Sequence, residues 1–238
     1  INIEIEGNLI QQKRHPSQEI NEGDNIDFSK LHSDILSSWG NAFRYKQEIP
    51  EYEVKGLRAP QIGAIHSVQA HCVLSEEPAT IVLPTGTGKT ETMLSIMIAR
   101  RCSKILVIVP TEPLRAQISD KFRTLGVLKD IGVVSSKALF PVVCTLKHIP
   151  KSTNAVNKIF SRSQVIVATV HLISQCSDEI KKPIAKHCPY LFIDEAHHRE
   201  AESWTQLIQY FSYRRIFQFT ATPYRNDGNT DIIKYHLG

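Results

Sequence analysis

The sequence lacks the features that would place it in a membrane or in a disulfide-stabilised scaffold. No run of apolar residues is long enough to span a bilayer, and the first residues do not form a secretory signal. The five cysteines include no C-x-x-C pair, which argues against a disulfide framework and favours an intracellular, reducing setting. Internal repeats and low-complexity tracts are also absent.

A zinc site is also poorly supported. His197 and His198 are adjacent, but their surroundings do not have the H-E-x-x-H spacing of a zinc-binding helix. His66, His71 and Cys72 lie close together on an expected helix, where their spacing does not build a standard site. We therefore expect packing or surface roles for His66, His71 and Cys72, and a surface role for His198.

Charge is divided unevenly along the 238 residues. Residues 1–55 contain 6 basic and 10 acidic residues, whereas residues 56–238 contain 22 basic and 14 acidic residues. The basic part suits a polyanionic partner, although a scattered, solvated surface would give the same total. We expect residues 1–55 to be an N-terminal extension and residues 56–238 to be one catalytic lobe.

Apolar runs and amphipathic segments alternate along the chain, which predicts a doubly wound, mainly parallel α/β sheet. Strands are expected at 80–83, 104–109, 131–134, 142–146, 164–168, 190–193 and 216–219, and helices at about 89–101, 113–125, 154–162, 177–187 and 201–211. In the extension, an apolar stripe predicts a helix at about 28–45. The residues before that helix could form an end strand, a remnant of another domain or a disordered segment.

A glycine-rich loop lies between the first of these lobe strands and its helix. Its sequence runs Leu-Pro-Thr85-Gly86-Thr87-Gly88-Lys89-Thr90, the arrangement that lets a helix N-terminus receive phosphate. The two glycines let backbone N–H groups surround phosphate oxygens, Lys89 would reach the outer phosphates and the hydroxyl of Thr90 would bind Mg²⁺. Leucine stands at position 83, where the strict pattern has glycine. The alternative is a chance glycine-rich turn.

Two carboxylates, Asp194 and Glu195, end the later apolar run 190–193. Parallel sheets place ligands at this end of their strands, so Asp194 would hold Mg²⁺ and Glu195 would orient and deprotonate the attacking water. Adjacent acids are common at solvated strand ends and carry little weight alone. In combination with the loop they predict an ATP-hydrolysing site, with Lys89 and Glu195 as its catalytic residues.

These motifs resemble those of the DEAH-box ATPases of helicase superfamily two, especially the group of restriction-enzyme translocase subunits and other DNA motors. The resemblance extends from Leu57 to Asn226 and implies a RecA-like first motor lobe. Residues 109–117 are similar to the family's motif Ia, 168–171 to motif Ib and 219–225 to motif III. Residues 57–61 resemble the adenine-recognition element.

The resemblance assigns further candidate roles. Thr111, Arg115 and Thr169 follow strands and could contact nucleic-acid phosphates. Helix capping is the alternative for Thr111, and a capping or turn role would explain Thr169 equally well. Arg58 and Gln61 could recognise adenine by stacking and by paired hydrogen bonds, or lie on the surface. Motif III contributes Thr220 and Thr222, which, with His197, would couple hydrolysis to movement.

Three functions fit this sequence: an ATP-driven nucleic-acid motor, a nucleotide-gated binding switch, and a binding domain with a decayed site. The last is disfavoured because Lys89, Thr90, Asp194 and Glu195 are all present. The expected partners are nucleic acid, with DNA favoured over RNA, and a second motor lobe. The chain begins at Ile1 without a methionine and ends at Gly238, so we expect a fragment that lacks the second lobe's arginine and hydrolyses ATP slowly alone.

Overall fold

The computed structural model describes residues 1–13, 26–195, 208–211, 215–221 and 233–235. In these residues the chain forms one sheet of nine strands, in the order β1-β2-β5-β6-β4-β7-β8-β3-β9. The strands are β1 (Asn2–Ile5), β2 (Asn8–Gln11), β3 (Ala79–Val82), β4 (Ile105–Val109), β5 (Val143–Thr145), β6 (Val165–Thr169), β7 (Tyr190–Asp194), β8 (Arg215–Thr220) and β9 (Ile233–Tyr235).

All neighbouring strands from β5 to β9 in this order are parallel, whereas β1 and β2 form an antiparallel hairpin that joins the sheet along β5. The predicted α/β class with a mainly parallel sheet is therefore confirmed. The central strands β4 and β6 are buried along their whole lengths, as expected for parallel strands covered on both faces.

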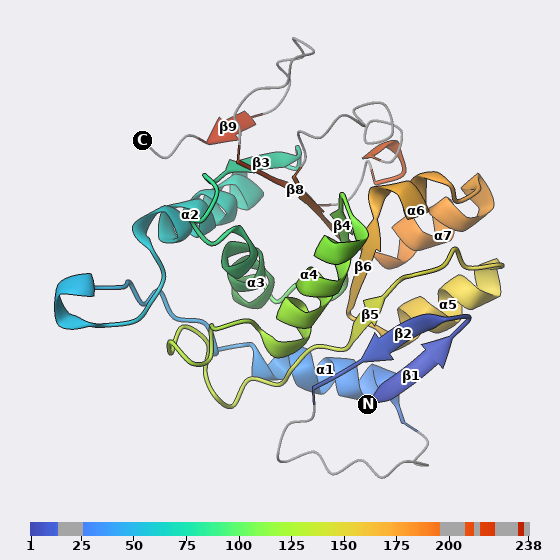
Figure 1. The fold of residues 1–238 in the computed structure, drawn as a ribbon, viewed down its shortest axis with the longest axis horizontal. Helices are drawn as coiled ribbons and strands as arrows, with labels where there is room; N and C mark the ends of the chain where they lie inside the picture. The colour runs from blue at the N-terminus through green and yellow to red at the C-terminus, as the bar shows by residue number, and fades with distance from the viewer. Residues whose placement is uncertain (14–25, 196–207, 212–214, 222–232, 236–238) are drawn as a thin grey trace.

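Helices cover both faces of the sheet (Figure 1). Helices α2 (Ala59–Leu74), α3 (Lys89–Ala99) and α4 (Glu112–Thr124) lie on one face, and α5 (Thr153–Arg162), α6 (Val170–Ser174) and α7 (Asp178–His187) lie on the other. Helix α1 (Phe28–Ser38) packs against α5. None of the helices in the described ranges has both the length and the apolar character needed to cross a bilayer.

One predicted strand is wrong. Residues 131–134 contain β-branched side chains, but the backbone turns here because Gly132 has φ +74°. The N–H groups of Val133 and Val134 both donate to the carbonyl of Leu128, each at 3.0 Å, instead of entering the sheet. Both valine side chains are fully buried. Burial alone therefore explains the apolar run that suggested a strand.

The N-terminal residues pair with the sheet, so the end-strand alternative describes residues 2–11. Asn8 on β2 is fully buried, and its Oδ1 accepts hydrogen bonds from the N–H groups of Lys147 at 2.7 Å and His148 at 2.8 Å. Trp39, just after α1, is 1% exposed and donates from Nε1 to the carbonyl of Leu139 at 3.0 Å. The predicted division of the chain at residue 55 remains a prediction, and these contacts cross it.

The histidine of α1 gives a prediction for acid stability. Burial, with a smaller contribution from the cation of Lys104, lowers the pKa of His32 from 6.5 to about 4. Because the pKa of His32 is lower in the folded protein than in the unfolded one, the unfolded chain binds a proton first as the pH falls. The contribution of neutral His32 to the unfolding free energy is therefore complete above pH 6.5 and is lost as the pH falls towards 4. With a discount for partial exposure, we expect His32 to account for about 1–2 kcal/mol of lost unfolding free energy. Urea unfolding at both ends of this range would show a smaller loss in His32→Leu, and an equal loss would contradict the assignment.

Candidate nucleotide-binding and hydrolysis site

The glycine-rich loop connects β3 to α3 at the carboxyl end of the sheet. Leu83 is 1% exposed, and its N–H donates to the carbonyl of Thr220 at 2.9 Å, so it extends the pairing of β3 with β8. The burial of its side chain in the core explains a leucine where the strict pattern has glycine. Gly86 and Gly88 have φ values of +82° and +89°, a left-handed backbone that glycine adopts at low cost. The hydroxyl of Thr87 donates to the carbonyl of Pro84 at 2.6 Å and closes the loop.

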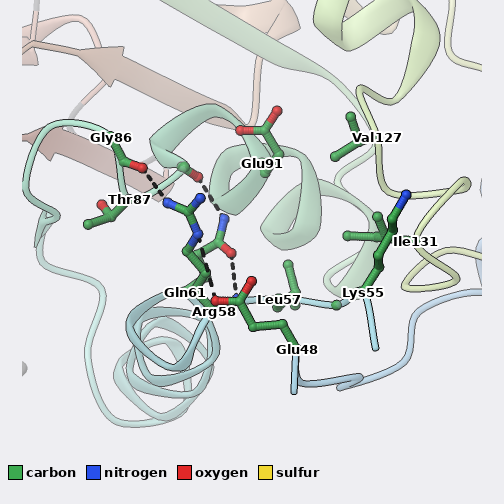
Figure 2. A pocket seen from close by; sticks show the side chains of 12 residues that line it. Glu48, Lys55, Leu57, Arg58, Gln61, Gly86, Thr87, Glu91, Val127 and Ile131 are labelled. Atoms are coloured by element: carbon green, nitrogen blue, oxygen red, sulfur yellow. Dashed lines mark hydrogen bonds and ion pairs between the residues drawn. The ribbon is translucent and has the colours of Figure 1, made fainter. Parts of the chain in front are cut away.

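Two side chains from the start of α2 hold this loop from outside (Figure 2). The guanidinium of Arg58 donates to the carbonyl of Gly86 and lies 3.8 Å from the carboxylate of Glu48. Gln61, which is 5% exposed, donates from Nε2 to the carbonyl of Gly88 at 3.0 Å and accepts from the N–H of Arg58 at 2.8 Å. Both residues therefore position the loop in this structure, and their predicted contacts with adenine remain a prediction.

A cavity of about 340 Å³ opens beside the loop. Its walls come from the segment before α2 with the first turn of that helix, from the loop with the first turn of α3, and from the turns after α4 (Figure 2). The lining includes Arg58, Gln61, Gly88, Val127 and Ile131. The apolar side chains of the last two face a rim that carries charged and amide groups, a combination common in small-ligand sites.

The ammonium of Lys89 meets the two strand-end acids. Lys89 and Glu195 are 106 residues apart, yet Lys89 Nζ donates to Glu195 Oε1. Nζ also lies 4.0 Å from Asp194 Oδ1, and the side chains of Lys89 and Asp194 are 13% and 8% exposed. Burial lowers the pKa of Lys89, and the nearby charge of Asp194 partly opposes this shift. The fold thus places the three predicted charged groups together at one end of the sheet.

Backbone geometry helps to aim the acid at the lysine. Glu195 has φ +54°, in the left-handed region that side chains other than glycine seldom adopt. This turn directly follows β7 and directs the carboxylate towards the loop. Such strain costs about 1–3 kcal/mol and concentrates at sites of function. The left-handed turn therefore accounts for how the carboxylate of Glu195 reaches Lys89.

The residues present fit a magnesium-bound nucleoside triphosphate. A Cβ added at Gly86 would meet no atom within 4 Å, so space for a ligand lies directly over the loop. Helix α3 starts at Lys89 and directs the positive end of its dipole at that space. Thr90, half-buried in the first turn of α3, and Asp194 supply the hard oxygen atoms that Mg²⁺ prefers. Thr85 is exposed at the start of the loop.

The three residues that were predicted to contact nucleic acid differ in the exposure of their side chains. Thr111 is exposed at the start of α4, and its side chain makes no capping hydrogen bond. Thr169 is 5% exposed and caps α6 by accepting from the N–H of Leu172 at 3.3 Å, which is the capping alternative. Arg115 is 7% exposed and donates to the carbonyl of Leu146 at 3.3 Å. Of these three side chains, only Thr111 is on the surface.

The coupling candidates are only partly described. Thr220 is 3% exposed at the end of β8, the strand that lies between β3 and β7. It is paired with Val82, and the preceding Phe219 is paired with Asp194, so Thr220 lies between the loop and the acids. His197 and Thr222 fall outside the described residues.

Sequence reasoning missed two acidic residues of the cavity, Glu48 and Glu91. Glu91 lies in the first turn of α3 and pairs with Lys121 of α4 at 2.8 Å. Its position two residues after Lys89 could have been a signal, since a carboxylate so close to a phosphate site needs a neutralising partner. That partner lies on another helix, where sequence spacing gives no indication.

The two loop glycines give a matched pair of substitutions. A Cβ at Gly88 would lie 2.3 Å from Gln61 Nε2, whereas one at Gly86 meets nothing. We therefore expect Gly86→Ala to lose about 1–2 kcal/mol of stability from backbone strain alone. Gly88→Ala should lose about 0.5–1.5 kcal/mol more, because the amide of Gln61 must move and gives up its hydrogen bond to the carbonyl of Gly88, and it should bind MgATP more weakly than Gly86→Ala. Thermal unfolding and nucleotide titration would measure both, and equal effects would contradict the packing argument.

A glycine-rich loop, a lysine and two strand-end acids on a mainly parallel α/β sheet define a nucleotide-binding lobe. Residues 55–225 match the family described as "Type III restriction enzyme, res subunit". This match covers more than half of the chain, which therefore belongs to that family. Together with its relatives, the match makes the chain a RecA-like lobe of the helicase type, whose members use ATP, typically with Mg²⁺.

Two curated relatives are similar over much of the chain. The "DNA 3'-5' translocase XPB2" of Sulfurisphaera tokodaii is 26% identical over 223 residues, which cover 87% of this chain and 45% of the relative. The "Putative ATP-dependent RNA helicase L396" of Acanthamoeba polyphaga mimivirus is 25% identical over 166 residues, which cover 68% of this chain and 27% of the relative. This chain thus spans less than half the length of either relative. Among solved structures, the Hef helicase domain of Pyrococcus furiosus is 24% identical, with a TM-score of 0.46 and coverage of 68% and 33%.

Proposed function

We propose that this chain is the first motor lobe of a DEAH-type, ATP-driven nucleic-acid motor that acts on DNA. The observation that carries the proposal is the contact of Lys89 with Glu195 and Asp194 beside the glycine-rich loop. A lysine for phosphate, an acid for the metal and an acid for water are the three parts that hydrolysis requires. The family match supports a motor lobe over other nucleotide-binding proteins.

Each residue has a defined role in this proposal. Backbone N–H groups at Gly86 and Gly88 surround the phosphates, and Lys89 exchanges its bond to Glu195 for the outer phosphate oxygens. Thr90 and Asp194 hold Mg²⁺, which neutralises developing charge when bound. Once Lys89 has left, Glu195 can orient a water and accept its proton. Arg58 and Gln61 read the adenine from the cavity side of the loop.

The nucleic-acid side of the lobe is proposed at the same edge of the sheet. Exposed Thr111 contacts a phosphate, while Arg115 and Thr169 shape the surface around it through their internal hydrogen bonds. Thr220, with His197 and Thr222, links that surface to the acids. DNA is favoured because the family is a restriction-enzyme subunit and one relative is named a DNA translocase. The other named relative is an RNA helicase, so experiments should include both polymers.

The full-length protein should hydrolyse MgATP faster in the presence of nucleic acid. The experiment compares single-stranded DNA, duplex DNA and RNA as activators, and then measures strand displacement and triplex displacement. Displacement supports a motor, and stimulated hydrolysis without displacement supports a nucleotide-gated switch. If no polymer stimulates hydrolysis, both functions are excluded. The proposed partner within the motor is a second lobe, whose arginine would stabilise charge on the transferring phosphoryl group.

A further inference from the structure

Helix α4 has one end at each of the two proposed ligand sites. It begins after Thr111, at the edge proposed for nucleic acid, and ends in a left-handed turn at Leu125. Val127 and Ile131, in the turns that follow, line the nucleotide cavity (Figure 2). A small shift of this helix would therefore displace residues at both sites.

The ion pair of Glu91 with Lys121 joins α4 to the loop helix α3 at the nucleotide end. The atoms Glu91 Oε1 and Lys121 Nζ are 2.8 Å apart, and the two side chains are 19% and 34% exposed. Oε2 of the same carboxylate lies 3.7 Å from where a Cβ of Gly88 would be, and Oε1 lies 3.5 Å from that of Gly126. The carboxylate is thus packed between the phosphate loop and the last turn of α4.

This position is electrostatically unfavourable for a phosphate site unless the charge is balanced. Glu91 is two residues from Lys89, so its charge opposes that of a bound triphosphate in a partly buried setting. Lys121 neutralises Glu91 from α4. A bound triphosphate would make an unpaired Glu91 carboxylate more unfavourable and would so stabilise its ion pair with Lys121. The pair in turn holds the end of α4 against the loop. Through this pair one helix would link the two sites energetically, and any such linkage is reciprocal.

We propose that the Glu91–Lys121 ion pair is a positioning element that couples nucleotide binding at the loop to nucleic-acid contact at the start of α4. The inference rests on the proposed function and adds to it two residues that contact neither phosphate nor nucleic acid. Coupling free energies of this kind correspond to about 5-fold to 150-fold in affinity, and a partly exposed pair belongs at the lower end of that range.

The first test is charge balance at the nucleotide. Lys121→Met leaves the carboxylate without its partner, so MgATP affinity of the full-length protein should fall about 5-fold. Adding Glu91→Gln removes the unbalanced charge, and the double variant should bind MgATP several-fold more tightly than Lys121→Met alone. A purely structural role predicts this order for the unfolding midpoints only, with equal MgATP affinities among the folded variants, because an unpaired carboxylate destabilises a fold more than the loss of both charges.

The second test is coupling itself. The fold-change in MgATP affinity caused by saturating single-stranded DNA is compared between wild type and Glu91→Gln/Lys121→Met, with RNA as a parallel arm. The double variant should lose most of this change. The matched control is Asp120→Asn, which breaks the exposed Asp120–Arg123 pair on the same helix and should retain the wild-type change.

The outcomes separate the two proposals. A wild type that binds no MgATP, or whose affinity for it responds to neither polymer, would overturn the proposed function together with this inference. A wild type whose MgATP affinity responds to nucleic acid, beside a double variant that responds equally, would overturn the inference alone. Unfolding midpoints of all variants ensure that the comparison is made between folded proteins.

Discussion

Replacing Glu195 with glutamine is expected to lower the turnover of nucleic-acid-stimulated ATP hydrolysis by about 10²–10⁴-fold, the usual contribution of a general base. Glutamine keeps the shape of the side chain but cannot accept the proton of water. This fold-change corresponds to a barrier about 3–5.5 kcal/mol higher. MgATP affinity should rise, because Lys89 no longer has to leave a carboxylate before it binds phosphate.

Steady-state kinetics of the full-length protein would show this split as a lower kcat with an equal or lower KM. Glu76→Gln is the matched control, because it makes the same chemical change at a surface position. The side chain of Glu76 is 93% exposed and forms an ion pair with Arg215. Turnover that survives in Glu195→Gln would assign water activation to another group. A matching loss in Glu76→Gln would indicate instability of the protein, which unfolding midpoints would reveal.

The site could be predicted from sequence because parallel strands order their carboxyl ends at one edge of the sheet. Once the runs 80–83, 190–193 and 216–219 were recognised as strands, Lys89, Glu195 and Thr220 had to lie at that edge. The structure places these strands next to one another in the order β7-β8-β3. The roles of the predicted site residues nevertheless remain predictions, because geometry shows where the groups lie and not what they bind.

Contacts that depend on the packing of helices could not be predicted. The interactions of Arg58 and Gln61 with the loop, and of Glu91 with Lys121, depend on how helices pack, which periodicity does not encode. The short strand β9 was also missed, and an end strand at the N-terminus was only one of three alternatives, because three or four residues give too little alternation to recognise. Buried turns such as 131–134 mislead for the opposite reason, since they are as apolar as a strand.

The last prediction concerns Trp39, which lies in the segment before the predicted boundary at residue 55. Trp39 is 1% exposed, and it belongs to the same buried cluster as residues of α3, β4 and β7. Trp39→Ala is expected to cost about 3–5 kcal/mol of unfolding free energy. Because whole domains are stable by only about 5–15 kcal/mol, a loss of this size would bring the lobe close to unfolding.

Urea unfolding, followed both by circular dichroism and by MgATP binding, distinguishes two arrangements of the chain. If residues 1–55 are part of the lobe's core, both signals shift together in Trp39→Ala. If they form a separate extension, nucleotide binding survives at urea concentrations where the extension has unfolded.

Two control variants accompany this experiment. Trp39→Phe keeps most of the packing but loses the hydrogen bond to the carbonyl of Leu139, so the loss of that bond should lower the unfolding free energy by only about 1 kcal/mol. Tyr52→Ala, at a side chain that is 79% exposed, is the surface control. The buried contacts that Trp39 and Asn8 make across residue 55 favour the first arrangement, in which the nucleotide site depends on the N-terminal residues for its stability.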